Sequence, residues 1–147
     1  MSGQTIDDDL YTHPAEFIDQ AVKSKEPFFV WFNTRRMHVW TRLKPSSQGK
    51  TGIGLYADGM VEHDELIGEL LKKIDDLGLR DNTIVIYTTD NGAKTVTWPD
   101  GGVTPFHGEK GTTWEGGMRV PRLVRWPSGL NHRRRRTDRR GASTSSS

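Results

Sequence analysis

Apolar residues along the chain alternate between helical spacing and short unbroken runs. The helical spacing predicts two amphipathic helices, over residues 12–23 and 55–77. Two apolar runs, FFVWF at 28–32 and TIVIY at 83–87, predict strands that are covered on both faces. The order strand, helix, strand predicts a βαβ unit, so we expect a mainly parallel sheet in an α/β fold.

The segments outside this unit are polar or rich in glycine. Residues 92–118 predict a loop longer than compact domains usually contain without a function, and residues 120–126 predict one more short strand. Residues 130–147 consist mainly of arginine and serine and predict a disordered tail. The polar residues 1–11 predict an exposed lead-in, which leaves one domain over residues 12–129. The lead-in contains three consecutive aspartates, Asp7, Asp8 and Asp9.

Composition excludes several classes of function. A length of 147 residues with a 33% hydrophobic share suits one domain with a compact core. No window approaches the roughly 18 consecutive apolar residues of a membrane span, and the N-terminal sequence lacks the pattern of an export signal. The chain has no cysteine, so it can form no disulfide, thiolate metal site or cysteine nucleophile.

The formal net charge of +2 originates in the tail. Residues 131–147 contain six arginines against one aspartate, which leaves a net charge of −3 on residues 1–130. A mildly acidic domain offers no general phosphate-binding surface. Nucleic-acid binding would therefore be a salt-dependent, sequence-blind property of the tail alone.

Polar residues follow both predicted strands of the βαβ unit. Asp90, Asn91 and Gly92 come directly after the second apolar run, and His38 lies a few residues after the first. Parallel strands end at the same edge of a sheet, so these side chains should converge there. A carboxylate beside an amide oxygen suits a hard cation such as calcium, whereas Asn-Gly by itself favours a plain turn.

The chain resembles the sulfatase family, in particular its bacterial arylsulfatase-like members, in six ordered segments: PFFVWFN, RMH, GKTGIGLYADGMVEHDELIGELL, DNTIVIYTTDNG, WPDGGVTPFHGEKGTTWEGGMRVP and VRWP. These cover residues 25–127, a minority of a full-length sulfatase. The resemblance implies part of a three-layer, alkaline-phosphatase-like α/β fold. It also implies hydrolysis of a sulfuric ester, carried by a small molecule or a sulfated glycan. Family members are often exported, whereas this sequence leaves the compartment open.

The same resemblance assigns roles to individual residues. Asp90 and Asn91 match the second ligand pair of a divalent metal, usually calcium. Lys110 matches the lysine that contacts the sulfate group, and His38 matches the histidine that contacts the ester and would protonate the leaving oxygen. We interpret two further histidines, His63 and His107, as solvated side chains.

Two family features are absent from this sequence. Sulfatases carry an early pair of aspartate ligands and a Cys-x-Pro-x-Arg segment whose cysteine becomes the nucleophile formylglycine. The aspartates in the lead-in follow no apolar strand, and formylglycine cannot form without cysteine. We therefore expect half a site, with weak calcium affinity and no turnover by the chain alone. We hypothesise that the start lies inside an ancestral gene and that the coding frame was lost near Gly129.

Three other interpretations remain open. In the first, the chain is one part of a split sulfatase, and a separate N-terminal chain supplies the aspartate pair and formylglycine. In the second, the chain acts as a tail-driven nucleic-acid binder. In the third, it is a phosphate-ester hydrolase of the wider superfamily, which would require additional metal-binding histidines after the Asp-Asn pair.

Overall fold

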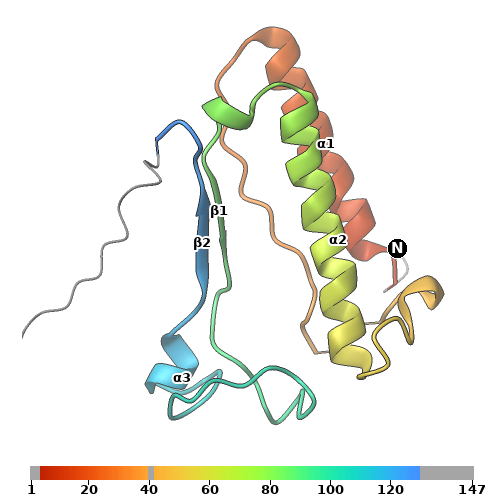
Figure 1. Cartoon of the computed structure of the whole chain (residues 1–147), viewed down its shortest axis with the longest axis vertical. Coiled ribbons are helices and arrows are strands. Elements are labelled where there is room, and N and C mark those ends of the chain that lie inside the picture. Colours follow the sequence, from red (N-terminus) through yellow and green to blue (C-terminus); the bar gives the residue numbers. More distant parts are fainter. Residues whose placement is uncertain (1–3, 40–41, 130–147) are drawn as a thin grey trace, which may run out of the picture.

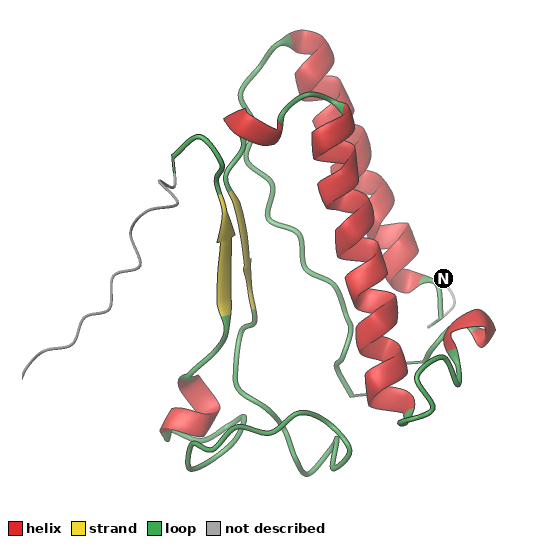
Figure 2. Ribbon diagram, in the orientation of Figure 1, coloured by secondary structure: helices red, strands yellow, loops and turns green. Residues whose placement is uncertain are grey.

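The computed structural model describes residues 4–39 and 42–129, so the predicted tail lies outside the described residues. Two long helices pack side by side, and a strand pair lies on the other side of the molecule (Figures 1 and 2). The elements are α1 (Ile6–Ser24), the short 3-10 helix η1 (Pro45–Ser47), α2 (Leu55–Asp76), η2 (Arg80–Asn82), β1 (Val85–Thr88), α3 (Glu115–Met118) and β2 (Arg122–Arg125).

Helix α1 begins well before the predicted start of the first helix. The three aspartates occupy its first turn, where negative charge is favourable because the backbone N–H groups of that turn point outward. Asp7 is 3% exposed and forms an ion pair with Arg36. The prediction of an exposed lead-in over residues 1–11 is therefore wrong for this turn.

Helix α2 forms where the sequence predicts it and ends one residue earlier than expected. The buried apolar side chains are Ile18 and Ala21 of α1, Leu66 and Ile74 of α2, and Leu43 from the segment before η1. These residues form the small core between the helices. None of the described helices combines the length and apolar character needed to cross a bilayer.

The strand pairing differs from the predicted one. Strand β1 pairs antiparallel with β2, with Ile86 opposite Val124, and no ladder is assigned to residues 28–32. In Figure 1 the segment 25–37 runs in the same direction as β1, so the chain follows the predicted course without the parallel ladder. The apolar run at 28–32 suits a strand covered on both faces, and among residues 4–39 and 42–129 no layer covers the side chains of Phe29 and Trp31.

The uncovered side forms a surface that we call the outer apolar face. Phe29 is 81% exposed and Trp31 is 78% exposed. Ile86 and Val124 of the strand pair are also exposed, as is Ile84, which directly precedes β1. Tyr87, the neighbour of Ile86 in β1, instead contacts α2, so β1 directs alternate side chains toward the helices and away from them.

Candidate functional site

The candidate residues lie on segments that meet near the C-terminal end of β1. Asp90 and Asn91 follow β1 directly, and Lys110 belongs to the loop 92–118. His38 lies in the turn at the end of the segment 25–37, and Figure 1 shows this turn and the loop at the same end of the molecule. The predicted convergence therefore holds for the backbone segments that carry these residues.

Hydrogen bonds fix the loop 92–118 at its base. The Gly92 N–H donates to the Gly117 carbonyl oxygen at 2.9 Å, and the Lys110 N–H donates to the Ala93 carbonyl oxygen at 2.8 Å. A Cβ atom added to Gly92 would lie 1.8 Å from the Gly116 carbonyl oxygen. Only glycine allows the two backbones to approach so closely. This packing holds Lys110 beside the segment that carries the Asp-Asn pair.

The turn that carries His38 is bonded to the same loop. The indole N–H of Trp98 donates to the Met37 carbonyl oxygen at 3.1 Å. The Nδ1 atom of His38 lies 3.2 Å from the Val39 carbonyl oxygen, and a carbonyl can only accept, so this contact assigns the proton to Nδ1. In the neutral ring, Nε2 is then the acceptor.

The donor chemistry of the Asp-Asn pair fits a hard cation, but the number of ligands is small. Asp90 offers a carboxylate and Asn91 an amide oxygen, the donor types that calcium prefers. Within residues 4–39 and 42–129, no three histidine, aspartate or glutamate side chains are grouped so that they could hold a metal ion. Among the described residues, Asp90 is therefore not part of a larger cluster of acidic or histidine ligands.

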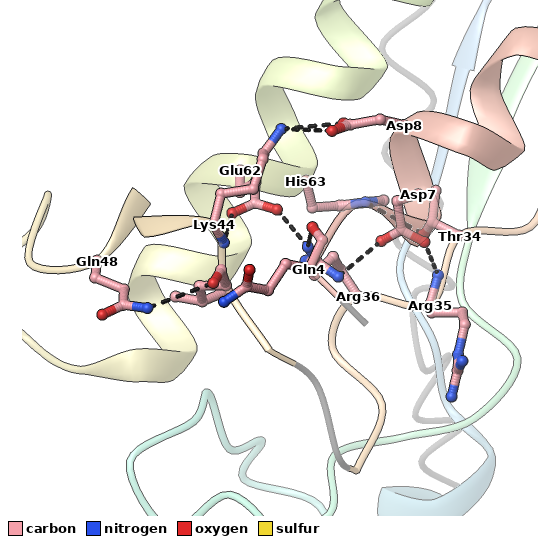
Figure 3. A network of polar contacts seen from close by, with 11 residues as sticks. Gln4, Asp7, Asp8, Thr34, Arg35, Arg36, Lys44, Gln48, Glu62 and His63 are labelled. Carbon is pink, nitrogen blue, oxygen red and sulfur yellow. Dashed lines mark hydrogen bonds and ion pairs between the residues drawn. The ribbon is translucent and has the colours of Figure 1, made fainter. Parts of the chain in front are cut away.

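A buried ionic network next to the site was missed by the sequence analysis (Figure 3). The guanidinium group of Arg36 forms ion pairs with Asp7 of α1, at 3.3 Å, and with Glu62 of α2. These side chains are 2%, 5% and 6% exposed, respectively. Lys44 extends the network, because its ammonium group lies 3.0 Å from Asp8 and its backbone N–H donates to Glu62. The sequence shows the charged residues of the network, in the run of three aspartates and in the RRMH segment. These two segments are far apart in the sequence, so no local pattern indicates that they form ion pairs.

The network keeps Glu62 ionised. Burial raises the pKa of its carboxyl group, but hydrogen bonds from Ser47 and Arg36 and the positive charge of Arg36 outweigh burial and hold the pKa below its usual value. Burial lowers the pKa of Lys44, but the hydrogen bond to Asp8 and the negative charges of Asp8 and Glu62 together outweigh burial, so the pKa is raised. Both groups remain charged at neutral pH.

The prediction that His63 is solvated is wrong. The residue is 7% exposed, with Nδ1 3.3 Å from the Thr34 hydroxyl and Nε2 3.1 Å from the Tyr87 hydroxyl. Burial lowers the pKa of His63, which favours the neutral ring. His63 therefore links α2 to both β1 and the segment 25–37. By contrast, His107 is exposed, as predicted, and its ring contacts Trp114.

Comparison with known proteins identifies the family. The family model described as Sulfatase matches residues 2–144 of this chain. The chain belongs to the sulfatase family. The match is wider than the stretch 25–127 that carries the motifs, and sulfatases as a family use a metal ion and a formylglycine.

Individual sulfatases match most of this chain with about one third of the residues identical. The chain is 36% identical over 133 residues to N-acetylgalactosamine-6-O-sulfatase of Bacteroides thetaiotaomicron, a match covering 82% of this chain and 25% of the relative. It is 35% identical over 113 residues to human arylsulfatase A, covering 76% of this chain and 22% of the relative.

A solved sulfatase structure also matches this chain. The crystal structure of the PsFucS1 sulfatase from Pseudoalteromonas sp. aligns with a TM-score of 0.79 and 38% identity, covering 84% of this chain and 25% of that one. The fold is therefore part of the alkaline-phosphatase-like α/β fold, as predicted. This sulfatase chain spans about a quarter of the length of the relatives that it matches.

Proposed function

We propose that this chain carries one half of an arylsulfatase-type site for sulfuric ester hydrolysis. In this proposal Asp90 and Asn91 bind calcium, and Lys110 and His38 contact the sulfate ester of a small molecule or a sulfated glycan. The hydrogen bond between Lys110 and Ala93 supports the proposal, because it holds the Lys110 backbone beside the segment that carries Asp90 and Asn91. The Trp98–Met37 hydrogen bond supports the inclusion of the turn with His38.

Each group has a defined chemical task in this proposal. The Lys110 ammonium group is a compact cation that can bind the sulfate oxygens. His38, when protonated, can donate a proton to the leaving oxygen of the ester. Calcium, when bound, would neutralise negative charge on the sulfate group. Family members take their nucleophile from formylglycine, and these 147 residues contain no cysteine from which it could form.

The proposal predicts binding without turnover by the chain alone. The purified chain should not hydrolyse para-nitrophenyl sulfate, with or without calcium. Titration with calcium, followed by the backbone amide signal of Asn91 in nuclear magnetic resonance (NMR) spectra, should give weak binding that disappears in Asp90→Ala. Asp81→Ala is the matched control, since Asp81 lies in η2, before β1 begins. Equal calcium affinity of the two variants would refute the metal assignment, and turnover would refute the need for the nucleophile.

The outer apolar face favours a second candidate function, one part of a split sulfatase. Exposed apolar surface of this kind typically marks an interaction site, and Phe29 and Trp31 supply two large aromatic side chains. The occupant would be an N-terminal sulfatase segment that contains the first aspartate pair and the formylglycine. Mixing the two chains should then restore hydrolysis of para-nitrophenyl sulfate. Trp31→Lys should abolish the restored activity, and unchanged activity in this variant would exclude docking at this face.

A further inference from the structure

Arg36 precedes the candidate histidine by two residues and has no assigned role. Its guanidinium group is buried and contacts three partners (Figure 3). It forms ion pairs with Asp7 and Glu62 and donates a hydrogen bond to the Gln4 carbonyl oxygen at 3.2 Å. These partners belong to α2, to the first turn of α1 and to the residues just before it. One side chain of the turn is thus tied to two separate parts of the fold.

The turn over residues 35–38 is also held through its backbone. The Arg35 N–H donates to the Asp7 carboxylate at 2.7 Å, so Asp7 binds both the backbone and a side chain of the turn. The His38 N–H donates to the Arg35 carbonyl oxygen at 2.7 Å and closes the turn. Met37 packs against α2, where a Cβ atom added to Gly59 would lie 2.1 Å from its sulfur. The backbone immediately before His38 is therefore fixed on several sides.

Stability alone gives little reason for this arrangement. Replacing a buried ion pair by apolar side chains of similar size is often neutral or stabilising, because burying charge has a large desolvation cost. Ion pairs and hydrogen bonds are, however, directional, so they fix the orientation of the groups that form them, whereas apolar contacts do not. Here two carboxylates from different helices fix one guanidinium group and thereby orient the turn.

We propose that Arg36 is a positioning residue, which orients the turn 35–38 so that His38 is presented toward the bound sulfate ester. The reference to sulfate rests on the function proposed above. The orientation of the turn rests on the ion pairs and hydrogen bonds that residues 35–38 form within the chain.

The test uses the full chain with isotope-labelled histidine and follows the ring signals by NMR. His38→Gln assigns the His38 signal, and the His63 signal reports on the packing of α2 against β1. In Arg36→Met, the His38 signal should move to the position of an unstructured histidine while that of His63 stays in place. Arg36→Lys should restore part of the original shift. The matched control is Arg35→Met, because the Arg35 side chain is exposed and the network uses only its backbone.

Two further outcomes keep the test decisive. If Arg36→Met also displaces the His63 signal, Glu62→Gln replaces it, since this change removes one charge and preserves the shape. An unchanged His38 signal in the variant that keeps its fold would overturn the proposal. Sulfate should shift the His38 signal of the original chain, and the apparent affinity should fall about tenfold or more in the Arg36 variant. Failure of sulfate to shift it would refute the proposed function and leave the orienting role to be decided by the ring signals.

Discussion

The close approach of Gly92 to Gly116 makes Gly92→Ala the sharpest perturbation of the candidate site. The new methyl group would lie 1.8 Å from the Gly116 carbonyl oxygen, whereas non-bonded contacts require about 3.5 Å. The two backbone segments would have to separate by more than roughly an ångström. That shift would break the Gly92–Gly117 hydrogen bond, and it would pull Lys110 away from the Asp-Asn pair.

The expected loss of stability follows from two terms. Overpacking of this kind typically costs about 1–3 kcal/mol, and the lost hydrogen bond adds about 1 kcal/mol. Together they predict a local destabilisation of about 2–4 kcal/mol. Because about 1.4 kcal/mol corresponds to a factor of ten, opening of the loop base should become about a hundred times more frequent.

Hydrogen exchange at the Lys110 amide measures this opening directly, since that N–H donates to the Ala93 carbonyl oxygen. Gly92→Ala should accelerate its exchange by about a hundredfold. Gly102→Ala is the matched control in the same loop, because a Cβ atom there meets no atom within 4 Å. If both variants protect the Lys110 amide equally, the glycine contact does not hold the lysine in place and this reasoning fails.

Three other predictions concern stability and association. In α2, Gly68→Ala should raise the free energy of unfolding in urea by about 0.5–1 kcal/mol, because its surroundings are open, whereas Gly59→Ala should lower it by displacing Met37. Equal effects of these two changes would contradict the packing. His63 has a lowered pKa in the folded chain, so unfolding takes up a proton, and stability should decline as pH falls below about 6.5. His63→Gln should remove this decline. If the free energy of unfolding of the original chain in urea is the same at pH 7 and pH 5, the prediction is wrong. We expect the exposed outer apolar face to cause self-association of the isolated chain, so Trp31→Lys should reduce its light scattering. Equal scattering by the two chains would show that this face does not cause self-association.

Local patterns predicted those features that depend on neighbouring residues. The apolar stripe of α2 lies within one segment, and its helix forms as expected. Asp7 has its partner in Arg36, which is remote in sequence, so a pattern of single residues could only describe it as polar. His63 is buried by Thr34 and Tyr87, which come from two other segments. The sequence thus indicates the elements and leaves long-range polar pairing undetermined.

Strand pairing shows the same limit. The apolar runs at 28–32 and 83–87 predict extended backbone. Which strands form hydrogen bonds with each other depends, however, on the other strands present. Here β1 pairs with β2, with Thr88 opposite Arg122. In the site, the order of motifs predicted that Asp90, Asn91 and Lys110 belong together, and the backbone brings their segments into contact. Their binding of metal and sulfate stays a prediction.

The paired base of the loop 92–118 has a consequence for how this fold can diversify. Because β1 pairs with β2 just outside the loop and the Gly92–Gly117 hydrogen bond joins its two ends, the base is fixed by contacts that do not involve the middle of the loop. Val103 near the tip is 64% exposed. Insertions or deletions around Val103 would therefore leave the base undisturbed. Relatives could then differ in the contacts that the middle of the loop makes, while Gly92, Lys110 and Gly117 keep their positions.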